Sequence, residues 1–154
     1  MEIEDILELE SVVTCLKATS KKQALEELSD KASKTIGQTE QEIFDVLLER
    51  ERLGTTGVGD GIAIPHGKIA GLNRLFGIFA RLESPIQFDA VDGQPVDLIF
   101  LLLAPESASA AHLKILSRIS RVLRDHSKCE KLRTAPTPEK IYSLLTRHTQ
   151  NRAA

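Results

Sequence analysis

The segment Gly57–Lys68, with sequence GVGDGIAIPHGK, contains the residue of this chain best suited to chemistry, His66. A short β-prone run, Ile62-Ala63-Ile64, ends in Pro-His-Gly, which predicts an exposed imidazole where a strand gives way to a loop. Nearby glycines leave room for a partner's backbone or an anion to approach. A neutral imidazole can act as a base, a ligand or a nucleophile. The competing interpretation is a histidine that only caps a strand end, and the glycine-rich setting favours function.

Two other residues could assist such chemistry by binding an anion. Arg50 lies near the expected end of a helix, and its planar guanidinium can bind phosphate oxygens with two parallel hydrogen bonds. His112 lies in the first turns expected for a later helix, where an anion is favoured by the helix dipole. Taken alone, each pattern fits a simpler interpretation better, namely a solvated arginine near a helix end and a half-buried helix histidine.

Other sites that use glycines, histidines or cysteines do not fit this chain. A Walker A loop needs four residues between its glycine and Gly-Lys, but five separate Gly61 from Gly67-Lys68, and no Ser or Thr follows. His126 and Cys129 offer only two metal ligands, so no metal site is expected. Cys129 is instead expected to pack as a small apolar side chain.

The run Arg50–Lys68 resembles the phosphorylation site of the IIA proteins of the bacterial phosphotransferase system, in their mannitol/fructose-type branch. The runs Ser84–Leu98 and Ala111–Leu116 also follow the pattern of this family, in the expected order. The resemblance is greatest to the nitrogen-regulatory group of that branch. Thr55 and Asp60 stand where the family more often has Ser and Asn, and both exchanges are small and polar.

The resemblance implies that His66 accepts a phosphoryl group on Nε2 from an HPr-like phosphocarrier, which is supplied by phosphoenolpyruvate. It also implies that Arg50 and His112 stabilise the phosphoryl group, and it implies no cofactor and no free small-molecule substrate. The phosphorylation state would then regulate target proteins, such as a sensor kinase or ion-transport regulators. The alternatives are a sugar-system transferase that passes phosphate from His66 to a separate IIB protein, and a binding module in which His66 is inert.

Size and composition are those of one ordinary domain over residues 1–154. A net charge of −2 gives no support for nucleic-acid binding. The chain has two cysteines and an acidic start with no signal peptide, and its longest apolar run, Leu98–Pro105, is too short to cross a bilayer. We therefore expect a cytoplasmic protein without membrane insertion.

Periodicity and capping signals predict an α/β fold, with a mixed β-sheet flanked by helices on its faces. Strands are expected over 11–16, 76–82 and 97–104, and the last is apolar enough to be covered on both faces. Helices are expected after capping boxes at Ser20, Thr39 and Ser127, after Ser107 or Ser109, and after Thr137-Pro138.

Two sets of apolar residues bear on the site. The helix after Pro105 is expected to bury Leu113, Leu116, Ile119, Val122 and Leu123. The surface around His66 must dock a carrier protein, and an apolar rim made of Ile62, Ile64, Ile69 and Leu72 is expected there.

Overall fold

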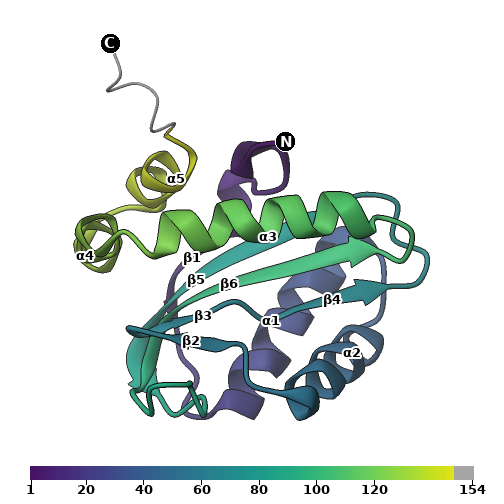
Figure 1. Cartoon of the computed structure of the whole chain (residues 1–154), viewed down its shortest axis with the longest axis horizontal. Helices are drawn as coiled ribbons and strands as arrows, with labels where there is room; N and C mark the ends of the chain where they lie inside the picture. The colour runs from purple at the N-terminus through teal and green to yellow at the C-terminus, as the bar shows by residue number, and fades with distance from the viewer. Residues whose placement is uncertain (148–154) are drawn as a thin grey trace.

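A computed structural model of the chain, which describes residues 1–147, shows a mixed sheet with helices on both faces, as the sequence predicts (Figure 1). The strand order is β1-β5-β6-β3-β2, and β4 pairs separately with β6. The strands are β1 (Val12–Leu16), β2 (Gly57–Gly59), β3 (Ile62–Ala63), β4 (His66–Ile69), β5 (Phe76–Ile86) and β6 (Val96–Pro105).

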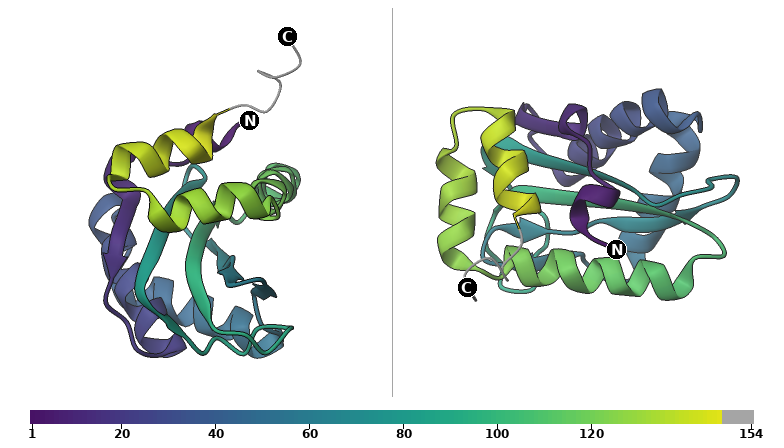
Figure 2. Two further views of the ribbon diagram at one scale, coloured as in Figure 1. Left: turned by 90° about the vertical axis from the view of Figure 1, so that its left-hand side faces the viewer. Right: turned by 90° about the horizontal axis from the view of Figure 1, so that it is seen from above.

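The helices divide between the two faces of the sheet, which Figure 2 shows from two directions. One face is covered by α1 (Lys21–Ile36) and α2 (Glu40–Leu53). The other is covered by α3 (Ser109–Leu123), α4 (His126–Thr134) and α5 (Pro138–Thr146). Two short 3-10 turns, Ile3–Asp5 and Leu9–Ser11, precede β1.

Strand β6 lies at the centre of the sheet and separates two apolar cores. Its even-numbered side chains from Leu98 to Ala104 face α3, α4 and α5, whereas Ile99, Leu101 and Leu103 face α1 and α2. The predicted burial of this strand on both faces is therefore confirmed. Its antiparallel neighbour β5 places Phe79 opposite Phe100, with the ring centroids 6.3 Å apart.

The predicted starts of α1, α2 and α5 are confirmed. The side chains of Ser20, Thr39 and Thr137 each accept a hydrogen bond from a backbone N–H in the first turn. Of these three residues, only Thr39 forms the full reciprocal capping box, with Glu42. The amide oxygen of Gln23 accepts instead from the backbone and hydroxyl of Thr19, one residue before the cap.

The predicted caps of α3 and α4 are wrong. Helix α4 begins two residues earlier than expected, because the carboxylate of Asp125 accepts from the Lys128 N–H. The N-cap of α3 is Ala108, which provides no side-chain cap. Ser109 lies one residue later, and its hydroxyl accepts a hydrogen bond from Lys68.

The buried face of α3 also differs from the prediction. Leu113 is 69% exposed, and the buried stripe begins at His112 and continues through Ile115, Ile119 and Leu123. This spacing of three and four residues is that of one helix face. The error arose because a histidine takes the first position of an otherwise apolar stripe, which displaces Leu113 to the solvent side.

Candidate functional site

His66 is the first residue of β4, not a residue of a loop that follows a strand. Strands β3 and β4 pair in succession with the same edge of β6, so Ala63 lies opposite Ile99 and His66 opposite Leu102. Between them, Ile64-Pro65 is a short interruption of the strand. The parallel pairing with β6 fixes the backbone of His66 more firmly than a loop would, and its side chain is half-buried.

The hydrogen bonding of the imidazole distinguishes its two nitrogens. Nδ1 lies 2.8 Å from the carbonyl oxygen of Ile64, which can only accept, so Nδ1 carries the proton of the neutral ring. Burial lowers the pKa of His66, the hydrogen bond to Ile64 opposes this, and the Arg50 guanidinium lowers the pKa further. The ring is therefore neutral at pH 7, with its lone pair on Nε2.

A tight hairpin joins β2 and β3 just before the site. Asp60 and Gly61 both have positive φ, 58° and 83°, as a two-residue type I′ turn requires. Aspartate is one of the few residues other than glycine that tolerate this conformation, so Asp60 fits the turn. Arg133 of α4 donates to the Asp60 carbonyl oxygen and, with two nitrogens, to the carboxylate of Asp97.

Glycine at position 67 allows α2 to approach β4. A Cβ atom placed on Gly67 would lie 2.5 Å from Cγ1 of Val46, closer than any real contact. Because side chains alternate along a strand, Gly67 faces α2 while His66 on one side of it faces α3. The short separation of α2 from β4 brings the end of α2 to the edge of the imidazole.

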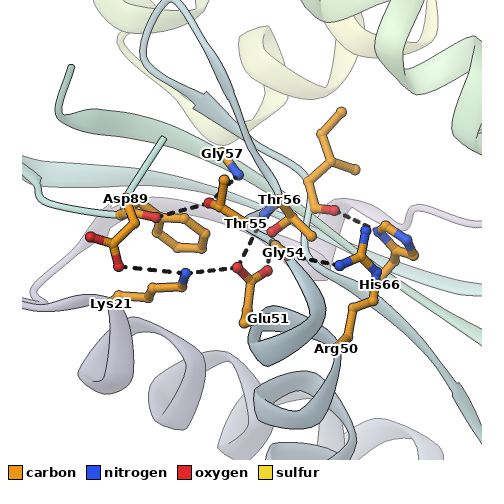
Figure 3. Close-up of polar contacts among 11 residues, drawn as sticks. Lys21, Arg50, Glu51, Gly54, Thr55, Thr56, Gly57, His66 and Asp89 are labelled. Carbon is orange, nitrogen blue, oxygen red and sulfur yellow. Dashed lines mark hydrogen bonds and ion pairs between the residues drawn. The ribbon is translucent and has the colours of Figure 1, made fainter. Parts of the chain in front are cut away.

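Arg50 occupies that end of α2, beside His66 (Figure 3). Its Nη1 atom donates to the carbonyl oxygen of Gly54 at 2.8 Å, which holds the guanidinium over the turn that leaves the helix. The remaining guanidinium N–H groups can donate to an anion. This arrangement suits an arginine that binds a group carried by the neighbouring histidine.

His112 comes from the first turn of α3, on the other side of the site. Its ring lies edge-on to that of His66, with centroids 5.5 Å apart and an interplanar angle of 79°. The side chain is 7% exposed, and its Nε2 atom has no hydrogen-bond partner among residues 1–147. Burial lowers the pKa of His112, and the nearby His66 and Lys68 lower it further. The structure thus brings together all three residues singled out in the sequence.

A buried ion pair beside Arg50 was not predicted. The carboxylate of Glu51 accepts from the backbone N–H and the hydroxyl of Thr56, and from Nζ of Lys21 at 2.8 Å (Figure 3). Lys21 also lies 4.8 Å from the centre of the Phe88 ring. These contacts fix the turn between α2 and β2. The Arg-Glu pair in the sequence was a signal for Glu51, but nothing local indicated Lys21.

The predicted apolar rim is wrong, because Ile62, Ile64, Ile69 and Leu72 are all buried in the two cores. Strands covered on both faces leave neither set of alternating side chains at the surface. The exposed apolar side chains nearest in sequence to the site residues are Leu53, 80% exposed, and Leu113, 69% exposed. Leu53 follows Arg50 by three residues and Leu113 directly follows His112 in the sequence, and we call these two residues the Leu53/Leu113 rim.

Two general features of the described residues bear on function. No helix within residues 1–147 is long and apolar enough to cross a membrane. In the same part of the chain, no three His, Cys, Asp or Glu side chains gather in a cluster that could hold a metal ion. Cys129 is buried, as predicted, and its Sγ lies 3.2 Å from the carbonyl oxygen of Leu123.

The fold and the match to a family model define the class of the protein. The model of the phosphoenolpyruvate-dependent sugar phosphotransferase system, EIIA 2, matches residues 5–148. The chain therefore belongs to the EIIA type 2 family. The crystal structure of IIA mannitol from Escherichia coli has the same fold, with a TM-score of 0.77 at 21% identity over 90% of this chain and 98% of that one.

Within the family, the resemblance to the nitrogen-regulatory group is confirmed. A nitrogen regulatory protein of Bradyrhizobium diazoefficiens is 56% identical over 145 residues, which cover 94% of this chain and 95% of that protein. The crystal structure of the nitrogen regulatory protein IIA-Ntr from Neisseria meningitidis gives a TM-score of 0.90 at 40% identity. It covers 94% of this chain and 99% of that one.

Proposed function

We propose that this protein is a phosphohistidine carrier and regulator, in which His66 accepts a phosphoryl group on Nε2 from an HPr-like phosphocarrier. One observation carries the proposal. The Ile64 carbonyl oxygen engages Nδ1 and leaves the lone pair of a neutral imidazole on Nε2. Membership of the EIIA type 2 family supports phosphoenolpyruvate as the original source of the phosphoryl group.

The transfer step balances without an added acid or base. The Nε2 lone pair forms a bond to phosphorus as the bond from phosphorus to the donor's histidine nitrogen breaks. The electrons of the broken bond stay on the donor ring, which leaves as a neutral imidazole. The proton on Nδ1 of His66 remains in place, and the Ile64 carbonyl oxygen stabilises the positive charge that the ring acquires.

Arg50 and His112 are proposed to hold the phosphoryl group from two sides. Phosphoryl transfer depends mainly on positioning and on neutralising the charge of the oxygens. Arg50 can donate from its remaining guanidinium N–H groups, and His112 can donate from Nε2, which has no hydrogen-bond partner among residues 1–147. The names of two similar proteins, both nitrogen regulatory proteins, favour a regulatory use of this phosphoryl group over sugar uptake.

The decisive experiment is phosphorylation of the purified protein with phosphoenolpyruvate, its enzyme I-like kinase and an HPr-like carrier. The wild type should gain one phosphoryl group that is stable in alkali and labile in acid, as a phosphoramidate is. His66→Ala should remain unlabelled with an unchanged thermal midpoint, while the control His126→Ala, which removes an exposed histidine on α4, should label normally. Normal labelling of the His66→Ala protein would overturn the proposal.

A second arm separates regulation from the sugar-system alternative. The phosphorylated protein is mixed with IIB proteins of the mannitol and fructose type, and loss of label is followed with time. The regulatory proposal predicts loss no faster than spontaneous hydrolysis. Rapid transfer to a IIB protein would show that the chain is a sugar-system transferase.

A further inference from the structure

Lys68 projects from β4 on the same side as His66. The two residues are separated by Gly67, and side chains at positions i and i+2 of a strand share a face. Their partners on β6 are Leu102 and Ala104, both of which belong to the core under α3. The lysine ammonium is therefore directed toward the start of α3, where His112 lies.

At the start of α3 the ammonium donates one hydrogen bond. Nζ of Lys68 donates to the hydroxyl of Ser109 at 2.9 Å, and both side chains are exposed. No acidic partner of Lys68 is found among residues 1–147, so this cation has a neutral ligand. The helix also lacks a side-chain cap, so backbone N–H groups of its first turn lack an acceptor there.

A second observation indicates that an anion belongs in this place. His112, on the same turn of α3, is buried with Nε2 unpartnered and with its ring beside that of His66. A buried nitrogen without a hydrogen bond costs free energy, which an acceptor arriving with the phosphoryl group would recover. The ammonium without an acidic partner, the helix without a side-chain cap and the nitrogen without a hydrogen bond all favour negative charge at this place.

We propose that Lys68 is a further ligand of the phosphoryl group and that the Ser109 hydroxyl binds the lysine ammonium until His66 is phosphorylated. In the unphosphorylated protein the ammonium binds the Ser109 hydroxyl. When His66 is phosphorylated, the ammonium leaves Ser109 and donates to the phosphoryl oxygens, completing a set of donors with Arg50 and His112. This inference rests on the proposed function of His66.

Lys68→Met and Ser109→Ala each remove the hydrogen bond between the two side chains, and the proposal predicts that they shift the phosphotransfer equilibrium in opposite directions. Lys68→Met should shift the phosphotransfer equilibrium toward the donor by about tenfold, because one charge-assisted hydrogen bond to the phosphoryl group is lost. Ser109→Ala should shift it about twofold toward phosphorylated protein, because the competing acceptor is gone. If the pair were merely structural, both variants would leave the equilibrium unchanged.

The measurement is the fraction of His66 phosphorylated at a fixed ratio of phosphorylated to free HPr-like carrier, followed by 31P NMR. Lys68→Arg should restore most of the wild-type fraction, because a guanidinium also donates to phosphate. The control is Lys114→Met, which removes the same charge from an exposed position of α3. It should leave the equilibrium within about twofold of wild type.

The outcomes separate this inference from the proposed function. If wild-type His66 takes up phosphate and Lys68→Met does so equally, Lys68 is not a ligand although the carrier function stands. If Lys114→Met is as defective as Lys68→Met, the effect is one of net charge and the inference fails. If the wild type is not phosphorylated at His66, the proposed function itself is wrong.

Discussion

The rings of His66 and His112 lie edge to face, 5.5 Å apart between centroids, although one comes from β4 and the other from α3. Neither ring is paired with a carboxylate among residues 1–147, in contrast to the usual arrangement of a catalytic histidine with an acidic partner. Two cations, Arg50 and Lys68, lie near this histidine pair and lower the pKa of His66 and of His112 respectively, and the more weakly acting Glu51 raises that of His66. Such an environment disfavours an added proton and favours an added anion.

Arg50 and His112 should affect the rate of phosphoryl transfer similarly but stability differently. Replacing either with Ala should slow transfer by about ten- to a hundredfold, because each removes one hydrogen bond of about 1.5–3 kcal/mol to a charged group. Arg50 is partly exposed, so its loss should change the free energy of unfolding by about 0.5 kcal/mol or less. His112 is buried, so its loss should cost about 1–3 kcal/mol.

Rapid-quench kinetics and urea denaturation test this pair of expectations. If both variants transfer the phosphoryl group at the wild-type rate, the two residues have only a structural role. Equal stability losses in the two variants would contradict the difference in burial on which the second expectation depends.

The pH dependence of transfer follows from the lowered pKa of His66, which burial causes first and to which Arg50 contributes. Only the neutral ring has a lone pair on Nε2, so the rate should be constant near pH 7 and fall at a pKa below the ordinary value of 6.5. The pKa of His112 is lowered too, so the unfolded chain binds more protons than the folded protein in this range. The free energy of unfolding should therefore decrease as the pH falls below 6.5.

NMR titration of the imidazole protons of His66 provides the check. Arg50→Gln should raise the pKa of His66, because it removes a nearby positive charge. A midpoint above 6.5 in the wild type, or a lower pKa in the variant, would contradict the electrostatic account of the site.

The ion pair between Glu51 and Lys21 should contribute more to the free energy of unfolding than an exposed ion pair does. Glu51→Ala leaves the ammonium of Lys21, whose side chain is 20% exposed, without its main partner and removes two hydrogen bonds from Thr56. Breaking such a pair costs about 3 kcal/mol. The matched control is Glu49→Ala on the same helix, whose exposed ion pair with Arg52 is worth about 0.5 kcal/mol. Similar denaturation midpoints for the two variants would show that burial adds nothing here.

Proteins that dock over His66 should bind the unphosphorylated form better. The phosphoryl group adds a charge of about −1.5 to −2, and a partner that buries it must desolvate that charge. His66→Asp should weaken binding partly in the same way. Calorimetric titration of one regulatory partner against the phosphorylated and free forms decides the matter. Equal affinities with a footprint that includes His66 would show that phosphate does not control this surface.

The Leu53/Leu113 rim should contribute to docking of the HPr-like carrier. Leu113→Ser removes an apolar side chain that is 69% exposed, so the affinity for the carrier should fall while stability is unchanged. Leu9→Ser, which alters an exposed leucine of the N-terminal 3-10 turn, is the control. The check is to follow the NMR signals of this protein while unlabelled carrier is added. Unchanged chemical shifts at Leu113 would contradict the prediction.

Local signals in the sequence predicted the helices and the strands β1, β5 and β6, but not β2 and β4. At the site they indicated only His66, because the roles expected for Arg50 and His112 came from the family resemblance, and they did not show how the site is assembled. Thr39 and Thr137 mark helix starts because capping depends on residues three apart. The position of Lys21 beside Glu51 depends on how α1 packs against α2, which no local pattern encodes. Likewise, Ile62 was expected to be exposed because it follows a glycine turn, but it is buried because both faces of β3 are covered.

The contact between Gly67 and Val46 also affects how a partner protein can distinguish the phosphorylated from the unphosphorylated form. Helix α2 and strand β4 meet with no space for even a methyl group, and β4 is paired along its length with β6. The backbone around His66 is thus set by packing, and a phosphoryl group attached there meets a frame with little freedom to adjust. Partners that bind the phosphorylated and unphosphorylated proteins differently would then respond to the change in electrostatic potential and not to a change in shape. Added salt would reduce the difference between the two affinities.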